Sequence, residues 1–292
     1  MTAALIDGTA VAARLRSEIA AEAEKMKSET GRVPGLAAVL VGDNPASQTY
    51  VRSKRKACAE VGIDSFGYEL PKTAAQEEVD NLVAELNADP NVHGILVQLP
   101  LPDHLNSEQA LSKIGIDKDV DGFHPINIGR LSMKGREPLF VPCTPAGCIY
   151  LLEQAGAQFK GARAVVLGRS NIVGLPVAML LLHRDCTLTI CHSRTKDLPA
   201  VCREADILIA AVGRPQMVKG DWVKPGAFVI DVGINRVDDA TKKSGYRLVG
   251  DVDFDEVKEV AGALTPVPGG VGPMTIAMLL RNTLRSATAH SA

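Results

Sequence analysis

One stretch near the middle of the chain limits most strongly what it can fold into. It reads Val165-Val166-Leu167-Gly168-Arg169-Ser170-Asn171-Ile172-Val173-Gly174-Leu175-Pro176. An apolar run that stops at a glycine, a short polar loop and a second glycine before another apolar series are typical of a strand, a tight turn and a helix N-terminus, which can face a phosphate. The spacing departs from the G-x-G-x-x-G dinucleotide fingerprint, because Ser170 replaces the middle glycine and the last glycine comes one residue late. The stretch alone therefore predicts either a dinucleotide loop or an ordinary strand–helix turn.

The rest of the chain alternates apolar runs with amphipathic stretches, which predicts an α/β protein of two domains. In the first part we expect helices over about 7–27, 47–61 and 76–87, and strands over 36–41, 65–70 and 94–99. Segment 117–145 is irregular and is expected to pass between the domains, and a helix over 146–155 opens the second domain. Its expected strands are 164–167, 187–191, 206–211, 227–231 and 263–265, in a Rossmann-like order.

The domain prediction follows from this pattern. We expect a three-layer α/β domain with a parallel-rich sheet over residues 1–144, completed by the C-terminal helix within 273–292, and a Rossmann-like domain over 145–272, with the active-site cleft between them. The apolar positions of the last helix, Met274, Met278, Leu279 and Leu284, are expected to pack on the first domain.

Composition excludes several classes of partner. The formal net charge is −2, which favours neither nucleic acid nor an anionic membrane as a partner. No apolar run approaches the roughly 20 residues that span a bilayer, and the N-terminal residues do not resemble a signal peptide. The six cysteines are scattered without paired zinc-site spacing, so we expect reduced thiols, no metal and a cytoplasmic enzyme.

The end of the second strand of the Rossmann-like domain discriminates between cofactors. An NAD site usually places an acidic residue there, which accepts a hydrogen bond from the ribose 2′-hydroxyl. Here Ser193 and Arg194 stand at that position, and Arg169 follows the first strand. A hydroxyl and guanidinium groups suit a 2′-phosphate, so we expect NADP rather than NAD. The alternative for each arginine is a solvated loop charge.

In the first domain, one expected helix carries polar residues on a single face. Ser47, Tyr50 and Lys54 are separated by three and four residues, which places their side chains together. A lysine whose surroundings favour the neutral amine can act as a general acid or base. By themselves, Tyr50 and Lys54 could equally be an ordinary surface pair.

Two other segments supply groups of the same kind. Gln98, between Val97 and Leu99, ends an apolar strand with an amide, and Asp121 lies in an irregular loop where a carboxylate can accept two hydrogen bonds from a flat ring edge. The neighbouring Asp117, Lys118 and Asp119 are more simply a solvated turn. Separately, the loop 265–273 combines prolines that fix φ with glycines that allow close approach, so it is suited to line a site.

Together these motifs resemble one family. Ser47-x-x-Tyr50-x-x-x-Lys54, Val97-Gln98-Leu99-Pro100-Leu101-Pro102, Asp119-Val120-Asp121-Gly122, Pro142-Cys143-Thr144-Pro145, Gly168-Arg169-Ser170-x-Ile172-Val173-Gly174 and Pro266-Val267-Pro268-Gly269-Gly270-Val271-Gly272-Pro273 occur in this order. The set is similar to the bifunctional methylenetetrahydrofolate dehydrogenase/methenyltetrahydrofolate cyclohydrolase family, in its short, bacterial-type form. The resemblance covers nearly the whole chain.

The resemblance implies two reactions: NADP-dependent oxidation of 5,10-methylenetetrahydrofolate to the methenyl form, and hydrolysis of that form to 10-formyltetrahydrofolate. It implies that the first domain binds the folate and the second binds NADP, and that the protein is a homodimer. Lys54 matches the group that serves the hydrolytic step, Gln98 the glutamine beside it, Tyr50 a folate contact and Asp121 the carboxylate that holds the pterin. The other substrate contacts it implies are Ser47, Val97, Leu99, Pro268 and Gly272. The cofactor contacts are Gly168, Arg169, Ser170, Ser193, Arg194 and Ile234.

Two rival interpretations fit parts of the pattern. A dehydrogenase for another metabolite, such as a shikimate-type or amino-acid-type substrate, would also have two domains and a Gly168 loop. A non-enzymatic nucleotide sensor would have no need to combine Lys54, Gln98 and Asp121.

Overall fold

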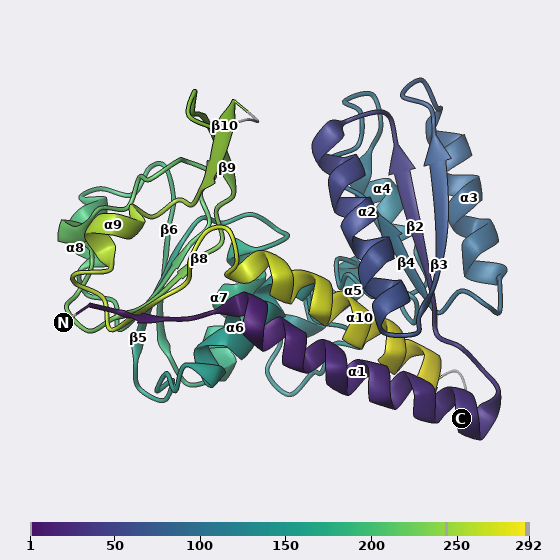
Figure 1. Cartoon of the computed structure of the whole chain (residues 1–292), viewed down its shortest axis with the longest axis horizontal. Helices are drawn as coiled ribbons and strands as arrows, with labels where there is room; N and C mark the ends of the chain where they lie inside the picture. The colour runs from purple at the N-terminus through teal and green to yellow at the C-terminus, as the bar shows by residue number, and fades with distance from the viewer. Residues whose placement is uncertain (1, 243–244, 290–292) are drawn as a thin grey trace. The chain divides into compact units, whose positions relative to one another are not determined.

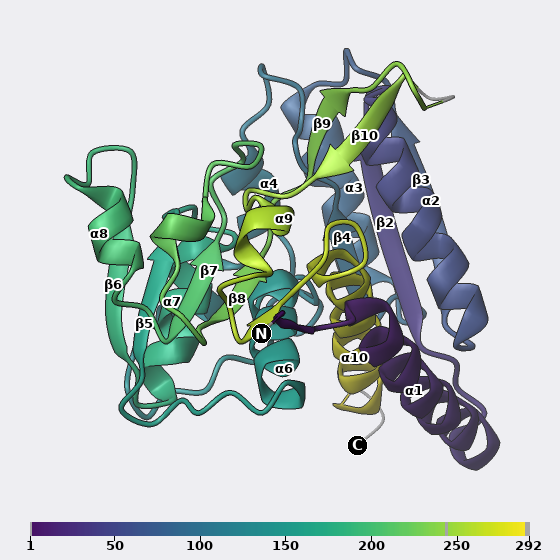
Figure 2. The same cartoon turned by 60° about the vertical axis from the view of Figure 1, so that its left-hand side comes forward.

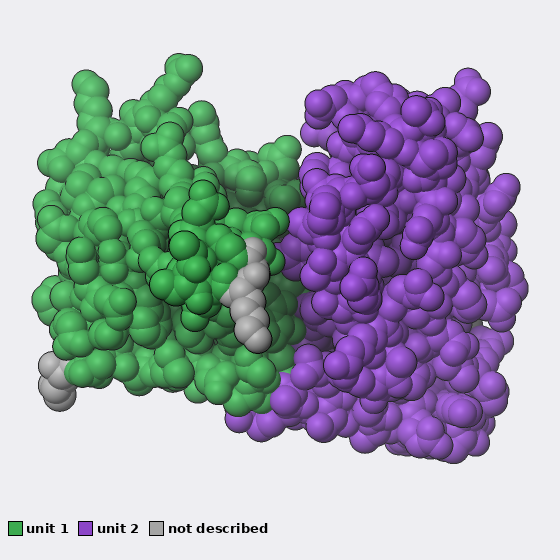
Figure 3. All heavy atoms as spheres, turned by 45° about the horizontal axis from the view of Figure 1, so that its top comes forward, with its two compact units in different colours: residues 1–12, 144–275 green, residues 13–143, 276–292 purple. Residues whose placement is uncertain are grey.

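The computed structural model describes residues 2–242 and 245–289, which form two compact units. Unit 1 comprises residues 1–12 and 144–275, and unit 2 comprises residues 13–143 and 276–292 (Figure 3). The division after residue 143 lies one residue from the expected boundary. Residues 1–12, however, were expected in the first domain and belong to unit 1, because strand β1 (Ala4–Leu5) pairs in parallel with a strand of that unit, β11 (Ala263–Leu264).

Unit 2 is built on a three-stranded parallel sheet in the order β3-β2-β4. The strands are β2 (Gly35–Val41), β3 (Asp64–Leu70) and β4 (Gly94–Val97), and helices α2 (Pro45–Glu60) and α3 (Gln76–Ala88) cover its two faces (Figure 1). The expected three-layer arrangement is therefore confirmed. Strand β4 ends two residues earlier than expected, because Leu99 precedes a proline that cannot donate to a sheet ladder.

Two long helices complete this unit. Helix α1 (Gly8–Thr30) ends before Gly31, which has φ +70°, and helix α10 (Val271–Ala289) runs beside it in both views (Figures 1 and 2). The first turn of α10 belongs to unit 1, so Met274 does not pack where we expected. Its buried side chain lies against Gly147 of helix α6 (Cys143–Gln154) in unit 1, and the expected packing of Met278, Leu279 and Leu284 within unit 2 holds.

The expected irregular segment contains more structure than the pattern suggested. Helix α5 (Pro125–Leu131) lies within it, and helix α4 (Ser107–Ser112) precedes it. His124 caps α5 by accepting a hydrogen bond from the Ile126 amide at 3.2 Å. Helices of two turns are too short to show a clear apolar period in the sequence.

Unit 1 has a six-stranded parallel sheet in the order β1-β11-β8-β7-β5-β6. Strands β5 (Arg163–Leu167), β6 (Thr187–Cys191), β7 (Ile207–Ala210) and β8 (Phe228–Asp231) lie side by side (Figure 2), and the connecting helical segments are α7 (Gly174–His183), α8 (Leu198–Cys202), the 3₁₀ turn η1 (Gly220–Trp222) and α9 (Phe254–Val257). The chain runs outward from β5 to β6 and then returns to the other side of β5. This reversal is the topological switch point of a Rossmann-like sheet, so that expectation is confirmed.

An antiparallel hairpin of β9 (Asn235–Asp238) and β10 (Tyr246–Val249) follows the last long strand and was not foreseen. The Arg236 guanidinium lies 3.7 Å from the centre of the Tyr246 ring, which fastens its two strands together. Among the described residues, no helix is both long and apolar enough to cross a membrane.

Candidate functional site

The sheet of unit 2 brings Lys54 and Gln98 into direct contact. Lys54 lies on the buried face of α2 with 8% of its surface exposed, and its Nζ donates a hydrogen bond to Oε1 of Gln98 at 3.0 Å. The amide of Gln98 is itself oriented, because Nε2 donates to the Leu99 carbonyl at 2.7 Å. A half-buried amide oxygen therefore fixes the position of a buried amine, as a proton-transfer group requires.

Asp121 lies in the electrostatic field of the same lysine. Burial raises the pKa of the Asp121 carboxyl, while the Lys54 charge and a hydrogen bond with Cys143 lower it. The buried Cys143 thiol donates to the Val120 carbonyl at 3.3 Å, and burial together with the Asp121 charge holds its pKa well above the ordinary value. Cys143 is thus a neutral thiol that packs beside the carboxylate, a role that its place in the Pro142-Cys143-Thr144-Pro145 motif did not indicate.

The residues before Asp121 are not the solvated turn that we expected. Asp119 is 1% exposed and accepts hydrogen bonds from the Phe123 amide, the His124 amide and Asn127 Nδ2, at 2.7 to 3.1 Å. Burial raises the pKa of Asp119 to about 6.

Lys118 is 6% exposed and donates to the carbonyls of Leu86, Asn87 and Asp89 at the end of α3. Such an ammonium satisfies carbonyls that a helix C-terminus leaves open. Lys118 and Asp119 therefore hold the loop that carries Asp121.

The other predicted folate contacts of unit 2 differ in how exposed their side chains are. Ser47 is buried on the Lys54 face of α2, while Tyr50 is 42% exposed, and burial of its hydroxyl raises its pKa. Val97 is fully buried in the sheet, and Leu99 is half-buried. Tyr50 and Leu99 are thus the members of this group best placed to touch a ligand, and Val97 acts through packing.

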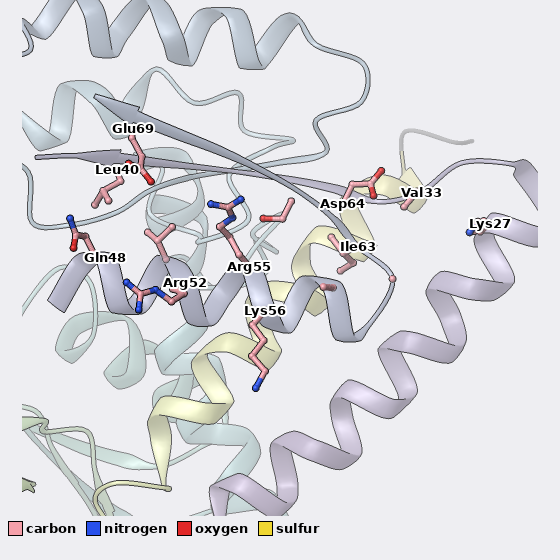
Figure 4. Close-up of a pocket in the computed structure, with 14 residues that line it drawn as sticks. Lys27, Val33, Leu40, Gln48, Arg52, Arg55, Lys56, Ile63, Asp64 and Glu69 are labelled. Atoms are coloured by element: carbon pink, nitrogen blue, oxygen red, sulfur yellow. The ribbon is translucent and has the colours of Figure 1, made fainter. Parts of the chain in front are cut away.

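A cavity of about 910 Å³ on the other flank of α2 does not include Lys54. It is lined by Gln48, Arg52 and Arg55 of the helix and by Ser65 and Glu69 of β3 (Figure 4). Arg55 points from the helix toward the sheet, whereas Lys56 points away from it. This groove lies at the sheet edge and is separate from the Lys54 cluster.

In unit 1, the Gly168 loop is shaped by close packing. Gly168 has φ +114°, and a side chain there would overlap the Ala211 carbonyl. A side chain at Gly174 would likewise overlap the Gly168 carbonyl, so the two glycines let β5 and α7 approach each other. Their role in this fold is the one that the outer glycines of a dinucleotide fingerprint have.

The N-terminus of α7 is less open than we expected. Ser170 Oγ accepts from the amides of Val173 and Gly174, each at 3.2 Å, and the Ser170 carbonyl accepts from the Leu175 amide. The next residue, Pro176, has no N–H. The amides at the start of this helix are therefore engaged by Ser170, and phosphate binding depends on the side chains around the loop.

Arg169 and Arg194 supply such side chains. They follow β5 and β6, which pair so that Leu167 is opposite Cys191. Both arginines and Ser193 are exposed, and within the described residues neither guanidinium makes a hydrogen bond or ion pair. The turn at Arg194 is ordered by its own amide, which donates to His192 Nδ1 at 3.2 Å. Two uncommitted cations at adjacent strand ends fit a phosphate group.

A second cavity in unit 1, of about 470 Å³, lies at the carboxyl end of β8. It is lined by Ile234, by Thr9 and by the loop 266–273, and so includes Pro268 and Gly272. Strands β8 and β6 are three sheet spacings apart, roughly 14 Å. An extended dinucleotide with its 2′-phosphate at Arg194 fits across this distance to the Ile234 cavity.

Comparison with known proteins agrees with this geometry. Residues 6–121 match the family model described as tetrahydrofolate dehydrogenase/cyclohydrolase, catalytic domain, and residues 142–291 match its NAD(P)-binding domain. The chain is 64% identical over 286 residues to bifunctional protein FolD 2 of Arabidopsis thaliana, covering 98% of this chain and 96% of that protein.

Solved structures are also similar to this chain, at lower identity. The FolD enzyme of Campylobacter jejuni has a TM-score of 0.92 at 49% identity, with 98% of each chain covered. The Trypanosoma brucei enzyme, solved with NADP and an inhibitor, has a TM-score of 0.96 at 46% identity, covering 99% of this chain and 98% of that one. The chain belongs to the tetrahydrofolate dehydrogenase/cyclohydrolase family.

Proposed function

We propose that this bifunctional enzyme uses the Lys54 cluster of unit 2 for hydrolysis and folate binding, and the loops of unit 1 for the oxidative step. Membership of the family gives it both activities: oxidation of 5,10-methylenetetrahydrofolate with NADP, and hydrolysis of the methenyl product to 10-formyltetrahydrofolate. The observation that carries the assignment of residues is the hydrogen bond between Lys54 and Gln98 beside the Asp121 carboxylate.

Lys54 performs the proton transfers of the hydrolytic step. Addition of water to the methenyl carbon forms a carbon–oxygen bond and releases a proton. Ring opening then breaks a carbon–nitrogen bond: the added hydroxyl loses its proton as it becomes the formyl carbonyl, and the leaving nitrogen takes up a proton. An amine held by Gln98 can accept the first proton and return one to the leaving nitrogen. Gln98 keeps the Lys54 lone pair or N–H directed at the reacting atoms, since its own Nε2 is anchored to Leu99.

Asp121 anchors the folate ring. Its carboxylate can accept two hydrogen bonds from the amide and amine groups on the edge of a pterin. The Lys54 charge favours the ionised form that this contact needs. Ser47, Tyr50, Val97 and Leu99 complete this folate site, with Tyr50 offering an exposed ring against which an aromatic ligand can stack.

The residues of unit 1 bind and orient the cofactor. Bound NADP supplies the hydride acceptor. Arg169, Ser193 and Arg194 hold its 2′-phosphate, Gly168 and Ser170 shape the loop beside it, and Ile234 lines the cavity that takes the other end. Pro268 and Gly272 line the same cavity and contact the substrate. Hydride transfer needs no protein acid or base, so positioning is the whole task of these side chains.

The test is a spectroscopic assay on the purified protein. NADPH formation from 5,10-methylenetetrahydrofolate is followed with NADP and with NAD in parallel, and loss of the methenyl chromophore is followed separately. We expect both activities, with a clear preference for NADP. Absence of methylenetetrahydrofolate oxidation would refute the proposed function, and an equal rate with NAD would refute the role of the two arginines.

We also infer that the protein is a homodimer, and the free edge of the unit 2 sheet supports this. Among the described residues, strand β3 pairs with β2 alone, so its outer edge offers unpaired backbone groups. Antiparallel pairing of two copies about Gly67 would place half-buried Phe66 opposite Tyr68 and Ser65 opposite Glu69. Arg55, whose guanidinium lies over Gly67, would then face Glu69 of the second copy. The strand is therefore complementary to itself, as a two-fold interface requires.

Crosslinking tests this interface. Gly67→Cys places two thiols opposite each other on the two-fold axis, and the native cysteines are all buried. We expect a covalent dimer on mild oxidation, no covalent dimer from the control Ala84→Cys on exposed α3, and dimers by light scattering for both. A light-scattering monomer would refute the dimer, and a dimer that Gly67→Cys does not crosslink would place the interface elsewhere.

The cytoplasm is the location that we infer, since the six cysteines are free thiols, which suits a reducing compartment. There the 10-formyltetrahydrofolate product would supply one-carbon units to purine and amino-acid biosynthesis. Fluorescence of the tagged full-length protein tests this; signal confined to an organelle would contradict it.

A further inference from the structure

Two buried carboxylates of unit 1 lie outside every motif that the sequence analysis singled out. Asp231 is the last residue of β8 and is 3% exposed, and Asp251 follows β10 and is fully buried. Each must be satisfied by hydrogen bonds, because a buried carboxylate without partners is costly. Their partners are nearly all backbone amides, and these belong to loops at the carboxyl edge of the parallel sheet.

Asp251 is hydrogen-bonded to two of these loops. Its Oδ2 accepts from the amides of Val212 and Gly213 at 2.6 and 3.0 Å, and its Oδ1 accepts from the Arg214 amide and from Asn235 Nδ2, both at 2.9 Å. Three successive amides around one carboxylate form an anion-binding concavity that the chain fills itself. These three amides follow β7 at the carboxyl end of the sheet, and they are occupied by Asp251.

Asp231 holds Asp251 and the neighbouring loop in turn. Its Oδ1 accepts from the amides of Gly233 and Asp251, and its Oδ2 accepts from the Val252 amide, all at 2.9 Å. Its own amide donates to Thr265 Oγ1 at 2.8 Å, at the start of the proline- and glycine-rich loop. Asp231 is therefore bonded to Gly233, which lines the Ile234 cavity, and to Thr265, which directly precedes the lining loop 266–273.

Two glycines lie directly against the carboxylates of Asp231 and Asp251. A side chain at Gly233 would overlap the Asp251 carboxylate, and a side chain at Gly250 would overlap that of Asp231. Replacing either glycine with any other residue would therefore displace a carboxylate. The backbone around the cavity is thus shaped by the two aspartates.

We propose that Asp251, held by Asp231, is a positioning residue that sets the loops after β7 and β8 and thereby the placement of the nicotinamide end of the cofactor. It touches neither ligand and acts through the backbone of residues 212–214 and the side chain of Asn235. The inference rests on the proposed function, because it assigns these loops to the dehydrogenase reaction. It predicts that the pair matters much more for oxidation than for hydrolysis, whose proposed proton-transfer residues Lys54 and Gln98 lie in unit 2.

The test compares both activities in Asp251→Asn. The amide keeps the shape but turns an acceptor into a donor that faces amide N–H groups. We expect kcat/KM for NADP to fall roughly ten- to a hundredfold, in line with the loss of charge-assisted hydrogen bonds. NADP affinity by calorimetry should fall in parallel. Hydrolysis of methenyltetrahydrofolate, which requires no NADP, should stay within about twofold.

Two further variants make the result decisive. Asn235→Ala removes one of the four hydrogen bonds to Asp251 and should give a smaller loss of the same kind if Asp251→Asn does not fold. Asp253→Asn is the matched control, because Asp253 bonds to Lys219 and the Glu256 amide and to neither loop. It should leave the NADP parameters unchanged.

The outcomes separate the two proposals. If the wild-type protein does not oxidise methylenetetrahydrofolate, the proposed function fails. If the wild type is active but Asp251→Asn and Asn235→Ala leave NADP kinetics intact, or lower both activities equally, the positioning role is refuted.

Discussion

Nζ of Lys54 and Oε1 of Gln98 are 3.0 Å apart, joined by a hydrogen bond between residues 44 positions apart in the chain. The helix contributes the amine and the end of β4 contributes the amide, so the contact exists only when α2 packs on the sheet. Gln98 thus gives Lys54 a fixed orientation without giving it a counter-charge. The amide partner is neutral, so it positions the Lys54 side chain without pairing it with a charge.

Gln98→Ala should slow hydrolysis more than oxidation. Lys54 would lose its neutral acceptor and its orientation, so we expect kcat for methenyltetrahydrofolate hydrolysis to fall roughly ten- to a hundredfold. Oxidation should change much less. Steady-state assays of both activities check this. The control is Gln109→Ala on α4, because the Gln109 amide bonds to Asp80 rather than to Lys54. A proportional loss of both activities would contradict a specific role for Gln98.

Arg194→Ala and Arg169→Ala should weaken NADP far more than NAD. Each guanidinium is exposed and uncommitted, so its removal costs the 2′-phosphate contact and little else. We expect the KM for NADP to rise about tenfold or more per arginine, with the KM for NAD nearly unchanged. Parallel titration of the two cofactors measures this, and an equal loss for both would refute the phosphate assignment.

Ser170→Ala should destabilise unit 1 as well as weaken NADP. The hydroxyl oxygen accepts from two amides at the start of α7, so its loss resembles loss of a helix cap and costs about 1 kcal/mol of unfolding free energy. Denaturant unfolding measures the change. Ser53→Ala, whose hydroxyl bonds to the Thr49 carbonyl within α2, should be nearly neutral. Equal stability of the two variants would contradict the capping role.

The titration of Asp231 should make the stability of the fold depend on pH. Burial, the largest cause, raises its pKa to about 7, with the Asp251 charge acting in the same direction and amide hydrogen bonds opposing it. A carboxyl whose pKa is raised on folding stabilises the fold below its unfolded pKa, and this contribution is lost as the pH rises through 7. Arg247 and Asp255 line the cavity on its other side.

Thermal unfolding between pH 5 and 8 measures this effect. The stability of the wild type relative to Asp231→Asn should fall as the pH rises, by at most about 1.4 kcal/mol per pH unit. A difference between the two proteins that does not change with pH would show that Asp231 does not titrate in this range.

Periodicity in the sequence was sufficient for the main elements and for the face of α2 that carries Ser47, Tyr50 and Lys54, because those relationships are local. It was insufficient where distant segments meet. Nothing near Ala4 indicates that it pairs with Ala263, and Lys118 and Asp119 read as a solvated turn because their partners lie elsewhere in the chain or arise from the loop's own conformation. Asp231 and Asp251 were missed for the same reason, since their partners are backbone amides, which no residue type reveals.

We propose that Lys54 performs the hydrolytic chemistry and that unit 1 holds the cofactor independently of it. Lys54→Met tests this most directly, because methionine fills similar space without a proton to transfer. Both activities are assayed together with NADP binding by calorimetry. We expect methenyltetrahydrofolate hydrolysis to be abolished while NADP and folate still bind measurably. Hydrolysis at the wild-type rate in this variant would contradict it.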